Sequence, residues 1–172
     1  WLNIPYVFSV QTEQLGTGHA VSVALQNRPK SRFSAVLNGD LPLLKADVFC
    51  KFFDAHAEKQ SLASVSSMVL DDPAHYGRIV KSPTLFEIVE YKDSTLVQKK
   101  IREVNGGLYL FDTSFLVGAI KKIDNQNKGG EFYLPDLFKI AKKHKARMLV
   151  FQVKDADTLL GVNNFKELAH AQ

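Results

Sequence analysis

The chain has 172 residues, of which 45% are hydrophobic and 23% charged, and its formal net charge at pH 7 is +4. This composition is that of a globular protein, and the length suits one domain with a sizeable core. The lone cysteine, Cys50, excludes an internal disulfide, suits a reducing compartment and is expected to fill a buried apolar position.

The sequence argues against membrane and nucleic-acid partners. No apolar run approaches the ~20 residues of a membrane span, and no signal peptide is visible. The lysine-rich stretches at 99–100, 121–122 and 142–145 have no interleaved aromatic residues, which favours a solvated surface over a nucleic-acid site. The five histidines show no metal-ligand spacing. We therefore expect a cytoplasmic protein that binds neither nucleic acid nor membrane.

Hydrophobic periodicity predicts strands that alternate with helices along most of the chain. The predicted helices are 17–25, 46–59, 113–123 and 136–144, with a last helix from residue 164; Thr17 and Thr113 are the expected caps of the first and third. The predicted strands are 34–37, 61–70, 104–111 and 146–153, with a hairpin formed by 78–80 and 85–90. This order implies an α/β fold with helices on both faces of a sheet.

The first predicted helix follows a glycine-rich loop, Gln11-Thr-Glu-Gln-Leu-Gly-Thr-Gly-His-Ala20. A helix that begins there offers free backbone N–H groups and the positive end of its dipole, which suit a phosphate or the edge of a base. A plain tight turn is the alternative interpretation of these residues alone.

A second candidate follows the strand 34–37, where Asn38-Gly39-Asp40 begins. The strand is expected to be buried and parallel, and ligands of open α/β sheets bind at the carboxyl ends of such strands. Asp40 is therefore a candidate metal ligand, although a Gly-Asp pair after a short strand is also a common turn.

These segments belong to an ordered series of motifs that covers nearly the whole chain. The series continues with Tyr76-Gly77-Arg78-Ile79-Val80, Ile88-Val-Glu90-Tyr-Lys-Asp93, Glu103-Val-Asn105-Gly-Gly107, Gly130-Glu-Phe-Tyr-Leu-x-Asp136 and Gly161-Val-Asn163-Asn164. It closely resembles the uridylyltransferase domain of the bacterial N-acetylglucosamine-1-phosphate uridylyltransferases, which make UDP-N-acetylglucosamine for peptidoglycan and lipopolysaccharide synthesis.

The resemblance implies a nucleotide-diphospho-sugar transferase fold, Rossmann-like, with a mixed but mostly parallel sheet. Residues 1–172 would form a partial nucleotidyltransferase domain, because the family's amino-terminal Gly-rich loop and its lysine have no counterpart here. No hexapeptide repeat of an acetyltransferase β-helix is present either. A truncated sheet would leave an open edge, so self-association or a displaced strand over residues 6–11 is expected.

The resemblance also implies a set of roles for individual residues. Asp40 and Asn163 would be the catalytic metal ligands for Mg²⁺, although Asn163 could instead cap the last helix. The implied uracil and nucleotide contacts are Gln11, Gly16, Thr17, Asn38 and Gly39, and the implied sugar contacts are Gly77, Glu90 and Asn105. Two departures from the family pattern, Gly106 and Pro135, place the geometry of the sugar pocket in question.

The expected reaction is transfer of a uridylyl group from UTP to N-acetylglucosamine 1-phosphate, which releases pyrophosphate. One alternative is a non-catalytic remnant that only binds a sugar nucleotide. Another is nucleotidyl transfer to a different sugar phosphate.

Overall fold

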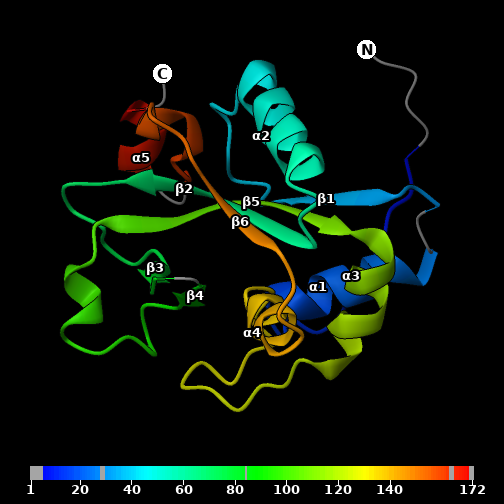
Figure 1. The fold of residues 1–172 in the computed structure, drawn as a ribbon. Helices are drawn as coiled ribbons and strands as arrows, with labels where there is room; N and C mark the ends of the chain where they lie inside the picture. The colour runs from blue at the N-terminus through cyan, green and yellow to red at the C-terminus, as the bar shows by residue number, and fades with distance from the viewer. Residues whose placement is uncertain (1–5, 28–29, 84, 163–164, 171–172) are drawn as a thin grey trace.

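The computed structural model describes residues 6–27, 30–83, 85–162 and 165–170. A six-stranded sheet lies at its centre, and helices pack against it (Figure 1). The strands are β1 (Phe33–Leu37), β2 (Ala63–Val69), β3 (Arg78–Lys81), β4 (Phe86–Val89), β5 (Glu103–Asp112) and β6 (Met148–Gln152). The α-helices are α1 (Thr17–Ala24), α2 (Ala46–Glu58), α3 (Thr113–Ala119), α4 (Asp136–Lys143) and α5 (Phe165–His170).

The sheet is mostly antiparallel, so the expectation of a mostly parallel sheet is wrong. The strand order is β4-β3-β5-β2-β6, and β1 also pairs with β5. Only β2 and β6 run parallel among the pairings of the described residues. The chain passes from β2 to β5 without an intervening α-helix, and a parallel neighbour needs a long crossover connection, usually a helix.

Strand β1 was expected to be buried and parallel, and it is neither. It pairs with β5 in antiparallel register, Phe33 opposite Asp112 and Leu37 opposite Leu108, and it is half-buried to exposed along its length. Among the described residues β5 is its one partner, so its other side is an open edge. Residues 6–11 form no strand, which contradicts the expected displaced strand.

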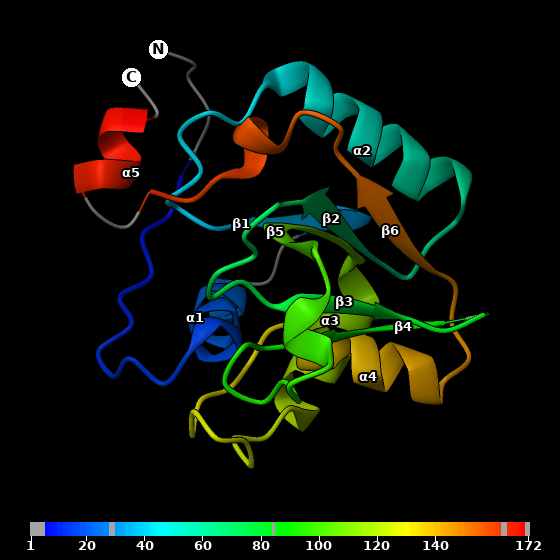
Figure 2. The same ribbon diagram turned by 90° about the vertical axis from the view of Figure 1, so that its left-hand side faces the viewer.

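The long strand β5 joins two hydrophobic cores, because its successive side chains point to opposite faces of the sheet. Tyr109 and Phe111 belong to the larger core, with residues of α3 and α4. Leu108 and Leu110 belong to a second core, with Phe52 of α2. Helices therefore cover both faces as expected, α2 on one side and α1, α3 and α4 on the other (Figure 2).

Three local expectations fail although the helices and strands lie close to their predicted positions. Thr17 does not cap α1, whose N-cap is Gly16. The cap of α3 is Asp112 rather than Thr113, and its side chain accepts from the backbone N–H groups of Ser114 and Phe115. Cys50 is exposed, because it lies on the side of α2 away from the core. None of the described helices is long and apolar enough to cross a bilayer.

Candidate functional site

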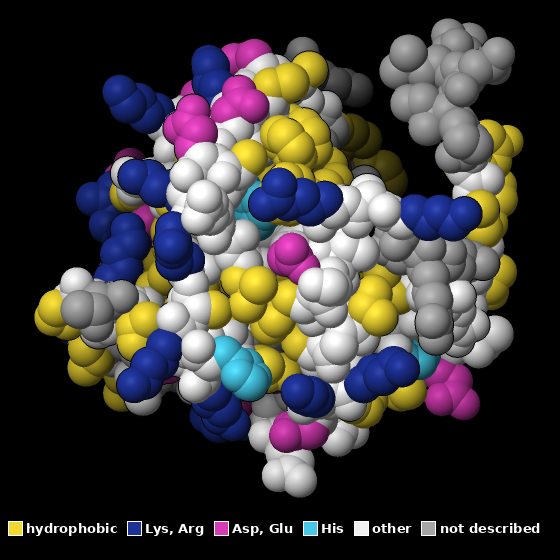
Figure 3. Space-filling model, turned by 45° about the vertical axis from the view of Figure 1, so that its right-hand side comes forward, with side chains coloured by type: hydrophobic (Ala, Val, Ile, Leu, Met, Phe, Trp, Pro, Cys, Tyr) yellow, Lys and Arg dark blue, Asp and Glu magenta, His cyan; other side chains and the backbone are white. Residues whose placement is uncertain are grey.

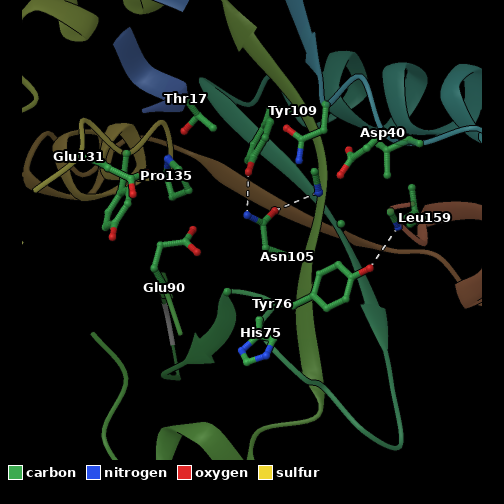
Figure 4. A pocket seen from close by; sticks show the side chains of 17 residues that line it. Thr17, Asp40, His75, Tyr76, Glu90, Asn105, Tyr109, Glu131, Pro135 and Leu159 are labelled. Atoms are coloured by element: carbon green, nitrogen blue, oxygen red, sulfur yellow. Dashed lines mark hydrogen bonds between the residues drawn. The ribbon is translucent and has the colours of Figure 1, made fainter. Parts of the chain in front are cut away.

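A cavity of about 250 Å³ opens beside β5, where the segments after β1 and before β3 meet it (Figure 4). Four groups of residues from distant parts of the chain line it. They are Thr17; Asn38, Asp40 and Leu41; His75, Tyr76, Gly77 and Glu90; and Asn105, Gly106, Gly107, Tyr109, Glu131, Tyr133, Pro135, Leu159 and Gly161. Residues that are up to 144 positions apart thus face one space.

Asp40 lies three residues beyond β1 and is anchored through its backbone. The N–H of Asn38 donates to the carbonyl of Gly107 (3.0 Å), and the N–H of Val162 donates to the carbonyl of Asp40 (2.9 Å). The carboxylate atom Oδ1 of Asp40 is buried without a hydrogen-bond partner among the described residues. A buried carboxylate oxygen is costly unless a donor or cation meets it, so this atom suits a hard divalent ion.

Strand β5 supplies the floor of the cavity. The backbone N–H of Gly107 donates to Oδ1 of Asn105 (3.1 Å), and Nδ2 of Asn105 donates to the hydroxyl of Tyr109 (2.6 Å). Gly107 has φ of +73°, and a Cβ there would lie 2.7 Å from Nδ2 of Asn38. Glycine is therefore favoured at this position by its positive φ, and a larger residue would also press on the side chain of Asn38.

Gly106 departs from the family pattern for a local reason. A Cβ on this residue would lie 2.6 Å from Cδ1 of Leu159 and 2.7 Å from Oγ of Ser66. A larger residue here would therefore have to displace the side chains of Leu159 and Ser66.

Glu90 follows β4 and faces Gly77 across the cavity. A Cβ on Gly77 would lie 3.1 Å from Oε1 of Glu90, so the glycine makes room for this carboxyl group. Burial, reinforced by the charges of Asp136, Asp93 and Glu131, raises the pKa of Glu90 to about 7. Glu90 thus changes charge near neutral pH.

Arg78 fixes the loop that carries His75 and Tyr76 to the cavity. Its side chain is 2% exposed, and its guanidinium donates to the backbone carbonyls of Pro73, Ala74, Tyr76 and Lys99. The hydroxyl of Tyr76 then accepts from the N–H of Gly161 (3.1 Å), which ties this loop to the last segment of the cavity wall.

The start of α1 reaches the cavity through its first residue, Thr17, which is the one lining residue among the described residues 6–27. The hydroxyl of Thr17 accepts from the N–H of Leu134 (3.1 Å), and the N–H of Gly18 donates to the carbonyl of Phe132 (2.7 Å). Nε2 of Gln11 donates to the carbonyl of Gly16 (3.2 Å) and lies 2.9 Å from Nδ1 of His19. Gln11 is therefore directed toward the start of α1.

The cavity brings together six of the ten residues that the sequence singles out: Thr17, Asn38, Asp40, Gly77, Glu90 and Asn105. Gln11, Gly16 and Gly39 lie outside its lining, and Asn163 lies outside the described residues. The lining also includes Tyr76, Glu131, Tyr133 and Gly161, which stand inside the recognised motifs but were given no role. Tyr109 lies outside them, and nothing in the sequence distinguishes it from a core residue.

The cavity is acidic. Asp40, Glu90 and Glu131 line it, and its described lining contains no lysine or arginine. On one face of the molecule, an acidic side chain lies near the centre among mostly uncharged and hydrophobic groups, with a basic side chain close above it (Figure 3). A phosphorylated ligand in this cavity therefore needs a counter-charge from a cation or from a group beyond the described lining.

Residues 2–158 match the nucleotidyl transferase family. The chain belongs to this family. It is 39% identical over 167 residues to the bifunctional protein GlmU of Clostridium beijerinckii, covering 96% of this chain and 36% of that protein. It is 40% identical over 168 residues to the GlmU of Halalkalibacterium halodurans, and this match covers 96% of this chain and 37% of that protein. The chain thus spans just over a third of the length of these relatives.

Proposed function

We propose that the cavity catalyses uridylyl transfer from UTP to N-acetylglucosamine 1-phosphate, giving UDP-N-acetylglucosamine and pyrophosphate. The observation that carries this proposal is the convergence of Asp40, Glu90, Asn105 and Thr17 on one cavity of a nucleotidyl transferase fold. The similarity to bacterial GlmU proteins supports a sugar phosphate as the acceptor.

The chemistry requires positioning more than activation of a nucleophile. The attacking group is a phosphate that is already an anion, so no covalent intermediate or general base is needed. Two anions must approach, and the site has to orient them and offset their repulsion. An acidic cavity cannot do this through its own side chains.

Asp40 is the residue that we assign to Mg²⁺, because its orphaned carboxylate oxygen fits a hard cation. Asn163 is the second proposed ligand. It directly follows Val162, whose N–H donates to the carbonyl of Asp40. Bound there, Mg²⁺ would neutralise phosphate charge and orient the phosphates for displacement.

Glu90, Gly77 and Asn105 are assigned to the sugar. The carboxyl of Glu90 can accept from sugar hydroxyls, and Gly77 lets the ligand approach the backbone. Asn105 keeps one amide hydrogen for a ligand after it donates to Tyr109. Thr17, Asn38 and Gly39 are assigned to the nucleotide, together with Gly16 and Gln11 near the start of α1.

The test is pyrophosphate release by the full encoded protein with UTP, Mg²⁺ and N-acetylglucosamine 1-phosphate. We expect Asp40→Asn to lose nearly all Mg²⁺-dependent turnover while its circular dichroism spectrum stays unchanged. Asp54→Asn, at an exposed position of α2, is the matched control and keeps the rate. Near-full Mg²⁺-dependent turnover in Asp40→Asn would refute the assignment.

The same assay separates the alternatives. Turnover with glucose 1-phosphate, dTTP or GTP in place of the proposed substrates would indicate another member of the nucleotidyl transferases. Binding of UDP-N-acetylglucosamine without any pyrophosphate release would indicate a protein that only binds the sugar nucleotide.

A further inference from the structure

Tyr109 combines a core position with a polar group at the cavity. Its side chain is 3% exposed, and its ring lies 6.2 Å from that of Phe111 and 6.3 Å from that of Phe138. The ring is thus part of the larger core, whereas the hydroxyl group reaches the cavity beside Asn105 (Figure 4).

The hydrogen bonds around Asn105 fix the role of this hydroxyl. The backbone N–H of Gly107 can only donate, so the amide atom that it meets at 3.1 Å is the oxygen of Asn105. The other amide atom is therefore the nitrogen, and it donates to the hydroxyl oxygen of Tyr109 at 2.6 Å. In this pair, Tyr109 is the acceptor.

The proton of the Tyr109 hydroxyl is then left for another partner. Within the described part of the chain, the contact with Asn105 is the one hydrogen bond that this hydroxyl makes. Burial raises the pKa of Tyr109 well above its usual value, so the group keeps its proton throughout the neutral range. A buried donor without an acceptor is unfavourable, and a ligand oxygen in the cavity would satisfy it.

We propose that Tyr109 is a further sugar-binding residue, whose O–H group donates a hydrogen bond to an acceptor oxygen of the N-acetylated sugar. The inference rests on the proposed function, because it takes the part of the cavity beside Glu90 and Asn105 as the sugar site. It assigns complementary roles to two neighbours: the carboxyl oxygens of Glu90 can accept hydrogen bonds from sugar hydroxyls, and the Tyr109 hydroxyl supplies a donor for a sugar oxygen.

The experiment measures binding by isothermal titration calorimetry with the full encoded protein. The probes are UDP-N-acetylglucosamine and UDP, which lacks the sugar and carries one more ionisable oxygen on its outer phosphate. We expect Tyr109→Phe to bind UDP-N-acetylglucosamine roughly three- to tenfold more weakly, the effect of one lost hydrogen bond, and to bind UDP as the wild type does. Tyr91→Phe, which removes a hydroxyl outside the cavity lining, should bind both probes unchanged.

A double variant separates direct contact from an effect through Asn105. If Tyr109 donates to the sugar, Tyr109→Phe weakens binding by a similar factor in the Asn105→Ala background. If the hydroxyl merely held Asn105 in place, the factor disappears in that background, and the proposal is wrong. Tyr109→Met fills a similar core volume without a hydroxyl, so it provides a second test should the phenylalanine variant fold poorly.

The outcomes distinguish this proposal from the function on which it rests. A wild-type protein that binds UDP-N-acetylglucosamine no more tightly than UDP, or binds neither, overturns both. A wild-type protein that gains affinity from the sugar while Tyr109→Phe binds equally well overturns the role of Tyr109 alone.

Discussion

The raised pKa of Glu90 predicts that the protein loses stability as the pH rises toward neutrality. The folded state holds this carboxyl proton up to about pH 7, whereas the unfolded chain releases it near the ordinary value of 4.5. Between these values the folded state binds more protons, so the free energy of unfolding falls with rising pH. Replacing Glu90 by Gln, which never ionises, should remove this decline.

The size of the effect follows from the two pKa values. A difference of about 2.5 units, at about 1.4 kcal/mol per unit, sets an upper limit of about 3.5 kcal/mol. Most of this change, roughly 2.5 kcal/mol, should occur between pH 5, where folded Glu90 is protonated, and pH 8, where it is mostly ionised.

Urea unfolding of the wild type and of Glu90→Gln at pH 5 and pH 8 measures the effect. The wild type should lose roughly 2.5 kcal/mol more than the variant over this interval. Glu58→Gln, at an exposed position in α2, controls for the removal of one carboxyl group and should follow the wild type. Parallel losses in the wild type and Glu90→Gln would show that Glu90 does not hold its proton in the folded state.

Four further outcomes are expected. Arg78→Met should lower the free energy of unfolding by roughly 2–4 kcal/mol in urea, because it leaves several carbonyls of the loop before β3 without their donor. Gly107→Ala should cost roughly 1–3 kcal/mol in the same measurement, since it adds strain at a positive φ and a contact with Asn38; an unchanged midpoint would contradict this account. Asn105→Ala should raise the KM for the sugar phosphate by roughly tenfold and leave that for UTP nearly unchanged, and equal losses would remove Asn105 from the sugar site. For the 172 residues alone, the edge of β1 that is unpaired within the described ranges should cause self-association that grows with concentration in analytical ultracentrifugation, and Ala35→Pro, on that strand, should reduce it.

The helices and strands were predictable because their hydrophobic periods are long and regular. The strand predicted at 61–70 is β2, and the helix predicted at 136–144 is α4, each within two residues at either end. The direction of the strands was not predictable in the same way. Alternation of helices and strands favoured parallel pairing. The hairpin of β3 and β4, however, lies between β2 and β5 in the chain, and β5 runs antiparallel to both β2 and β3.

The burial of single side chains depends on which face of an element the core covers. Cys50 and Phe52 stand two positions apart in α2, so they point to nearly opposite sides of the helix, and only Phe52 reaches the core. The apolar neighbours of Cys50 gave no indication of this. The capping role of Asp112 was missed because Thr113 beside it is also a residue type found at N-caps.

Five polar residues of the cavity, Thr17, Asn38, Asp40, Glu90 and Asn105, were predicted through their motifs, whereas Glu131, His75 and the aromatic residues were not. Asp40 and Asn105 stand in short segments that resemble a known family. Tyr109 lies in a strand whose alternate positions are apolar, so its ring predicts a core position and its hydroxyl is noticed only in three dimensions. Gln11 stays a prediction, because its contacts lie at the start of α1 rather than in the cavity.

The position of β5 divides the cavity into a fixed part and adaptable parts. This strand is bonded to β1, β2 and β3, and its residues enter the cores on both faces, so a change in its backbone would disturb the whole sheet. The walls are loops, at 73–77, 130–135 and 159–162, which are held by a few hydrogen bonds. A change in sugar preference would therefore come from substitutions in these loops rather than in β5. An inhibitor that discriminates between related enzymes should likewise contact the loops.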